Sequence, residues 1–125
     1  MGTVEQRVRT HIKSAATLRT FAKRAPFVVR DLDNAGVILL LGTKRASTPL
    51  SWACLEGIPG FLRNKGWITV GGSRRVEGDP GTLDEYLKSW IKRDIANYVT
   101  SLLAHAGIVD VDVGPPTRVR LREES

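Results

Sequence analysis

The chain has 125 residues, 42% of them hydrophobic and 26% charged, which is typical of a folded domain and excludes wholesale disorder. Its single cysteine excludes an internal disulfide framework, and its longest apolar run, residues 37–41, is too short to span a membrane. We therefore expect one soluble, cytoplasmic domain over residues 1–125, with no membrane partner.

The net charge of +6 is concentrated at the start of the chain. Residues 1–30 contain seven arginines and lysines against one glutamate, whereas residues 31–125 contain twelve basic and twelve acidic side chains. Localised positive charge favours a polyanionic partner, while evenly spread charge mainly maintains solubility. A solvated helix face would explain the same excess, so both interpretations stay open.

Residues 1–25 are predicted to form a basic amphipathic helix. Thr3 and Gln6 match a capping box, and Pro26 ends the pattern. Apolar residues at spacings of three and four would share one face: Val4, Val8, Ile12, Ala15, Leu18 and Ala22. The opposite face would present four basic side chains to solvent or to phosphates: Arg9, Lys13, Lys23 and Arg24.

A hairpin and a second helix are predicted next. Residues 27–31 and 37–41 read as strands joined by the turn residues 33–36, and the second strand is expected to be central because it does not alternate. Thr48 would cap the helix, with Pro49 at its first position and a kink or break near Gly57.

The start of this second helix is a candidate phosphate site. Free N–H groups and the positive end of the helix dipole would face a basic loop. The site would comprise Lys44, Arg45, Ser47 and Thr48. An ordinary exposed loop is the alternative, and the sequence contains no G-x-x-x-x-G-K-[ST] loop for nucleotide hydrolysis.

A second candidate contact is a predicted wing. Residues 67–70 read as a strand, Gly71-Gly72 as a tight turn and residues 73–77 as a return strand that carries Arg74 and Arg75. A helix followed by such a wing, over Thr48–Glu77, resembles the winged-helix DNA-binding domains. The intervening hairpin and the short segment 60–65 depart from that pattern, so the family is not assigned. Trp67 is the aromatic residue to test for base stacking.

The last third of the chain predicts a long helix and a terminal hairpin. Thr82 and Glu85 match a capping box for a helix that ends near Ala106. Residues 108–113 and 117–122 alternate as strands, and a tail covers residues 120–125. Asp110 and Asp112 could pair with arginines across the hairpin or bind Mg²⁺, and the arginines offer the simpler explanation.

No catalytic motif is present, so a non-enzymatic role is favoured, without metal or cofactor. His11 and His105 lack partners at ligand spacing, and Cys54 reads as a buried structural thiol. The expected fold is α+β, with three helices on a mostly antiparallel sheet built from hairpins, in a helix–hairpin order repeated three times.

The favoured function is that of a nucleic-acid-binding module, with DNA as the expected ligand. Its sites would be the N-terminal helix, the basic loop and the wing. The alternative is a protein-interaction subunit or inhibitor that docks on an acidic partner. A metal-dependent enzyme that uses Asp110 and Asp112 is a third interpretation.

Overall fold

The structure is a computed structural model, which describes residues 2–72 and 75–122. Five helices and seven strands are defined in these ranges. The helices are α1 (Thr3–His11), α2 (Trp52–Glu56), α3 (Ile58–Leu62), α4 (Leu83–Lys88) and α5 (Ala96–His105). The strands are β1 (Ala16–Arg19), β2 (Pro26–Leu32), β3 (Gly36–Leu41), β4 (Ala46–Ser51), β5 (Ile68–Thr69), β6 (Val109–Asp112) and β7 (Arg118–Leu121).

The first four strands form an antiparallel sheet in the order β1-β2-β3-β4. Each strand pairs with the next along the chain, from Ala16↔Val29 at one edge to Gly36↔Ser51 at the other. The predicted hairpin of residues 27–41 is confirmed as β2–β3, with Asp33 accepting from the amides of Ala35 and Gly36 in the turn. Alternate side chains of this sheet are buried, because only one of its faces meets the core.

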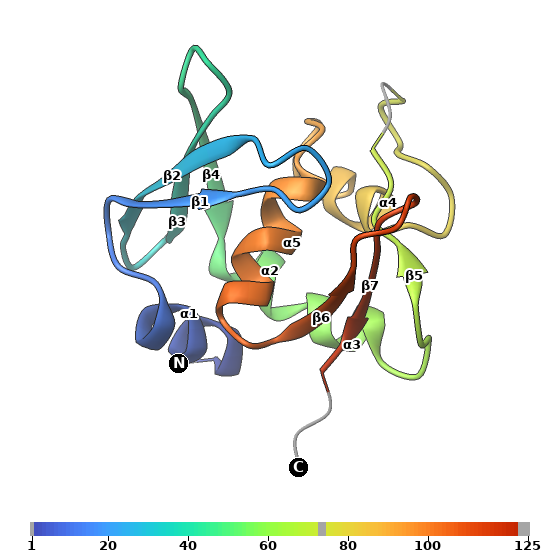
Figure 1. The fold of residues 1–125 in the computed structure, drawn as a ribbon. Coiled ribbons are helices and arrows are strands. Elements are labelled where there is room, and N and C mark those ends of the chain that lie inside the picture. Colours follow the sequence, from blue (N-terminus) through green and yellow to red (C-terminus); the bar gives the residue numbers. More distant parts are fainter. Residues whose placement is uncertain (1, 73–74, 123–125) are drawn as a thin grey trace.

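A smaller three-stranded sheet has the order β5-β7-β6. Helix α5 lies in the middle of the molecule, with the four-stranded sheet on one side and the β6–β7 hairpin on the other (Figure 1). Its apolar side chains belong to a single buried cluster that draws residues from both sheets. The α+β class is therefore confirmed, but the threefold helix–hairpin order is not what the chain adopts.

The predicted helix over residues 1–25 is wrong beyond residue 11. Residues 16–19 instead form β1, because their backbone pairs with β2 and Leu18 is buried between exposed neighbours. The Thr3–Gln6 capping box is also absent. Residue Gly2 is the N-cap, and the Glu56 carboxylate of α2 accepts from the amides of Val4 and Glu5 at 3.0 and 2.9 Å.

The predicted helix start at Thr48 is wrong as well. Residues 46–51 pair with β3 along their whole length and form the edge strand β4, where the missing N–H of Pro49 breaks no ladder. The helix begins after Ser51, whose hydroxyl accepts from the Cys54 amide at 3.1 Å. The predicted break near Gly57 is confirmed, since α2 and α3 are separate short helices.

Two later predictions also need correction. The long helix is interrupted after Lys88, and α5 begins only at Ala96, although Thr82 caps α4 as expected. The strand at residues 67–70 does not return as a hairpin: β5 pairs with β7, and residues 75–77 form no strand. The terminal hairpin is confirmed as β6–β7, with Asp110 opposite Arg120 and Asp112 opposite Arg118.

Among the described residues, none of the helices has the length and apolar character that a membrane crossing would require.

Candidate nucleic-acid interface

The antiparallel order of β1–β4 determines where the basic turns lie. In a four-stranded meander the first and third turns lie at the same end of the strands, and the second turn lies at the other end. We call the end with the β1–β2 turn (residues 20–25) and the β3–β4 turn (residues 42–45) the open end. The closed end carries the β2–β3 turn (residues 33–35) and packs near α1.

Four of the predicted phosphate ligands lie on the two turns of the open end: Lys23, Arg24, Lys44 and Arg45. All four side chains are exposed, and none forms a hydrogen bond or ion pair within the described part of the chain. The turns themselves are fixed. The Thr20 amide donates to the Ala25 carbonyl and the Ala25 amide donates to the Thr20 hydroxyl, both at 3.0 Å. The Arg45 amide donates to the Gly42 carbonyl at 3.2 Å.

The two polar residues assigned to the helix start have a different role. Ser47 and Thr48 lie on β4, where the Ser47 carbonyl and the Thr48 hydroxyl both accept from Arg93 Nη1 at 3.0 Å. Thr48 is buried, and its hydroxyl is occupied by Arg93. Because Arg93 is held at β4, it adds a fifth cation to the open end.

Three further residues of this region were not identified from the sequence. Asp94 precedes α5, and Asn97 and Tyr98 lie in its first turn. Two cavities adjoin them, one of about 190 Å³ beside the β1–β2 turn and one of about 500 Å³ beside β3–β4. Asp94 and Tyr98 line both cavities, so we name the two together the Asp94 hollow.

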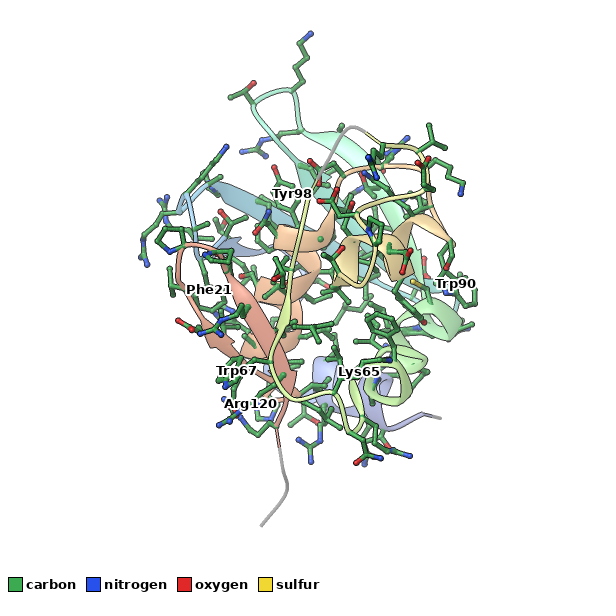
Figure 2. The ribbon with its side chains drawn as sticks, turned by 90° about the vertical axis from the view of Figure 1, so that its right-hand side faces the viewer. Phe21, Lys65, Trp67, Trp90, Tyr98 and Arg120 are labelled. Atoms are coloured by element: carbon green, nitrogen blue, oxygen red, sulfur yellow. The ribbon has the colours of Figure 1, made fainter. Side chains whose placement is uncertain are left out.

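The side chains of the hollow retain their hydrogen-bonding capacity. The Asp94 carboxylate, the Asn97 amide and the Tyr98 hydroxyl form no hydrogen bond with any other described residue. The Tyr98 ring packs edge-on against Phe27, with ring centres 5.3 Å apart, which fixes its position. Figure 2 places Tyr98 at the end of the molecule that carries the β3–β4 turn.

The pKa of the Asp94 carboxyl is shifted by burial and by four neighbouring charges. Partial burial raises the pKa of its carboxyl, and the nearby charges of Asp84 and Asp79 raise it further, while Lys88 and Lys23 lower it. Asp84 and Lys88 form a buried pair at 3.3 Å behind the hollow. Lys23 is therefore close enough to Asp94 to affect its ionisation from the β1–β2 turn.

The loop after β5, which belongs to the predicted wing, lies against two side chains of the hollow. A Cβ atom placed on Gly72 would lie 3.3 Å from Asp94 Oδ1 and 3.7 Å from Asn97 Nδ2, so the loop after β5 closes against these two side chains. Gly72 has a φ of +141°, which only glycine adopts readily. Arg75 follows this loop and is exposed, and Arg74 lies outside the described residues.

The other two predicted ligands lie elsewhere. Arg9 is held near the closed end, where it donates to Glu5 and to the Asp33 carbonyl, both at 2.9 Å, and lies over the Trp52 ring. Lys13 is exposed between α1 and β1, also away from the two basic turns. The predicted continuous basic face of residues 1–25 is therefore wrong, because α1 ends at residue 11.

A second group of arginines is neutralised within the β6–β7 hairpin. Arg118 pairs with Asp112, and Asp110 accepts from Arg120 at 3.2 Å and from Arg122 at 2.8 Å. These guanidinium groups hold the pKa of each aspartate below its usual value. The described residues contain no group of three or more His, Cys, Asp or Glu side chains arranged to bind a metal.

Trp67 belongs to this second region and not to the basic turns. It lies beside Arg120, 4.5 Å from guanidinium carbon to ring centre, and the two residues appear together in Figure 2, far from Tyr98.

Cys54 is buried as expected, and burial raises the pKa of its thiol to about 11.

After α3 the chain continues as β5, α4, α5 and the β6–β7 hairpin, with β5 paired to β7, so the helix–wing arrangement expected over Thr48–Glu77 is not formed in the described residues. Here most of α5 is buried, and its Ser101 hydroxyl donates to the Arg19 carbonyl of β1. This helix is therefore covered by the four-stranded sheet and has no free face for a groove.

No protein-family model, curated protein or solved structure matches the chain.

Proposed function

We propose that the protein is a non-enzymatic nucleic-acid-binding module that contacts phosphates through the open end of its four-stranded sheet. The observation that supports this most strongly is that two separate basic turns, Lys23-Arg24 and Lys44-Arg45, lie at the same end of the strands. These residues are about twenty positions apart in the chain. The meander β1–β4 gives the two turns this common end.

The charges of the open end are available to a ligand. Exposed cations that form no ion pair with a described residue can release the counterions of a phosphate chain, which is the main source of non-specific affinity. The two turns belong to neighbouring hairpins, because β2 pairs with β3. A flexible backbone with several phosphates can reach both turns, and Arg93 lies beside β4 to extend the contact.

The alternative is a partner protein with an acidic surface, which would meet the same cations. Docking through a long basic N-terminal helix is not available to the protein, because α1 spans only nine residues and its Arg9 already bonds to Glu5. We therefore favour the nucleic acid. The lone buried cysteine is compatible with the cytoplasmic location that we also propose.

Fluorescence anisotropy tests the proposal with labelled single-stranded DNA, duplex DNA, single-stranded RNA and polyglutamate across a range of salt concentrations. We expect nucleic-acid affinity to fall linearly on a log–log plot, with a slope of roughly −3 to −4 for four or five contacts on a single strand. Salt-independent binding, or tighter binding of polyglutamate than of any nucleic acid, would contradict the proposal.

A matched pair of variants locates the contact. Lys44→Glu lies at the open end and Lys13→Glu lies away from it, and each changes the net charge by the same amount. Both side chains are exposed and make no bond with described residues, so neither change removes a structural contact. We expect Lys44→Glu to weaken binding about tenfold and Lys13→Glu to weaken it less than twofold. Equal losses would show that only total charge matters.

A further inference from the structure

The Asp94 hollow lies between the two basic turns that we assign to phosphates. One of its cavities is lined by Lys23 of the β1–β2 turn and the other by Arg93 beside β4. A nucleic-acid backbone that contacts both turns therefore passes over the hollow. A base of that strand that turns toward the protein would then face the hollow.

The hollow has the hydrogen-bonding groups that a base requires. Asp94 offers two carboxylate acceptors, Asn97 offers an amide that can donate or accept, and both approach the same point beside Gly72. None of these groups is used by another described residue. A carboxylate and an amide on one wall match the edge of a base, whereas phosphate contacts need only cations.

Contacts with the Watson–Crick edge require an unpaired base. Hydrogen bonds from Asp94 and Asn97 would reach the Watson–Crick edge, which is occupied in a duplex. Asp94 and Asn97 together line the cavity of about 190 Å³ beside the β1–β2 turn, and Asp94 and Tyr98 continue into the adjoining cavity of about 500 Å³ beside β4. Tyr98 forms a wall common to both cavities, and aromatic side chains of this kind contact unpaired bases.

The charge of Asp94 indicates which base fits. An ionised carboxylate accepts hydrogen bonds and repels acceptor atoms, so it favours a base edge with N–H donors. Guanine presents two adjacent donors, N1–H and the N2 amino group, next to the acceptor O6. The carboxylate can accept from both donors while the Asn97 amide donates to O6. Thymine and uracil present only one donor between two acceptors.

We propose that the Asp94 hollow binds an unpaired guanine base of a single-stranded nucleic acid, with Asp94 and Asn97 as the residues that determine base preference. This inference rests on the proposed function, because the cations of the open end hold the strand. It adds that single strands are preferred to duplexes and that one base position is read.

The test uses labelled twelve-residue oligomers: all thymine, the same with one central guanine, the same with one central adenine, and a duplex that contains the guanine. We expect the single-stranded guanine oligomer to bind about tenfold tighter than the all-thymine oligomer, and adenine to lie between them. The duplex should show no gain from guanine. Free GMP should compete only at concentrations far above those of the oligomer.

Variants separate base reading from charge. Asp94→Asn removes a negative charge and will strengthen binding to every oligomer, so the measured quantity is the ratio of guanine to thymine affinity. We expect this ratio to fall to about one in Asp94→Asn and in Asn97→Leu. Lys44→Glu should weaken both oligomers equally and leave the ratio unchanged. Circular dichroism confirms that each variant is folded.

The outcomes distinguish the two proposals. Salt-dependent binding of all oligomers with a guanine-to-thymine ratio near one would overturn the base site and leave the phosphate contacts intact. Absence of binding to every oligomer would overturn both. Competition by GMP at the concentration of the oligomer would assign the hollow to a free nucleotide and overturn the strand-based inference.

Discussion

The two ends of the four-stranded sheet use the same residue types for different purposes. At the closed end, Arg9 bonds to Glu5 and to the Asp33 carbonyl, and the Glu56 carboxylate holds the first turn of α1. At the open end, Lys23 and Lys44 bond to no described residue, and Asp94 remains without an ion pair. Charges that bond internally stabilise the fold, whereas charges left without partners are available to a ligand.

The comparison shows that a basic composition does not locate a binding surface. All of the excess charge of the chain lies in residues 1–30, yet these residues are divided between the two ends. The β6–β7 hairpin gives the same lesson, because its three arginines are matched by Asp110 and Asp112. What distinguishes the open end is that its turn side chains form no ion pair with any described residue, although Lys23 lies near enough to Asp94 to lower the pKa of that carboxyl.

The largest expected effect is at the closed end. Glu56→Ala removes the acceptor of two helix amides, so we expect a loss of about 2 kcal/mol in the free energy of unfolding. Glu56→Gln keeps one acceptor oxygen without the charge and should lose about half as much. Urea denaturation followed by circular dichroism measures both. An Ala variant as stable as the wild type would contradict the assigned cap.

The next effect compares one arginine from each end. Arg9→Met removes two hydrogen bonds and the contact with Trp52, and we expect it to cost about 1 kcal/mol of stability. Arg45→Asn removes only an exposed cation, and asparagine tolerates the φ of +51° at this turn, so stability should change by less than about 0.5 kcal/mol. Nucleic-acid affinity should fall more in Arg45→Asn than in Arg9→Met.

The smallest effect is a pH dependence at the open end. The pKa of Asp94 is raised in the folded protein, so its ionisation opposes folding. Below the ordinary pKa of 3.8 the carboxyl is protonated in both the folded and the unfolded protein, and ionisation costs the folded state nothing. As the pH rises through the raised pKa, the folded protein must ionise a partly buried carboxyl, so its stability decreases. Asp94→Asn should therefore raise the melting temperature slightly at pH 7.

The same variant should have no stabilising effect near pH 3, where Asp94 is protonated in both states. The charged groups that act on Asp94 are Asp84, Asp79, Lys88 and Lys23, and they are unchanged in the variant. Melting curves from pH 3 to pH 7 provide the measurement. A variant less stable than the wild type at pH 7 would mean that the ionised carboxylate stabilises the fold.

Local patterns predicted part of the fold. The turn residues 33–36 and the alternating strands with Asp110 and Asp112 opposite arginines are local signals, and both hairpins are confirmed. The segment Thr17-Leu18-Arg19 also alternates, but a longer helical spacing from Val4 to Ala22 obscured it. Pairing with β2 then decided the structure, because tertiary contacts override weak helix propensity.

The candidate site could be predicted less well than the fold. The sequence identified Lys23 and Lys44 as cations, but their proximity depends on the meander, which requires β1 and β4 to be strands. Asp94 and Asn97 were placed on a continuous helix and so received no role. The charged run 92–94 within an apolar pattern was the local signal of a break before α5.

The most direct test of the open end is an NMR titration of the ¹⁵N-labelled protein with a single-stranded oligonucleotide. If the open end is the interface, the amide signals of residues 20–25, 42–48 and 93–98 will shift as the strand is added, and those of residues 3–13 and 33–35 will not. Shifts confined to α1 and the β2–β3 turn, or to the β6–β7 hairpin, would contradict the account.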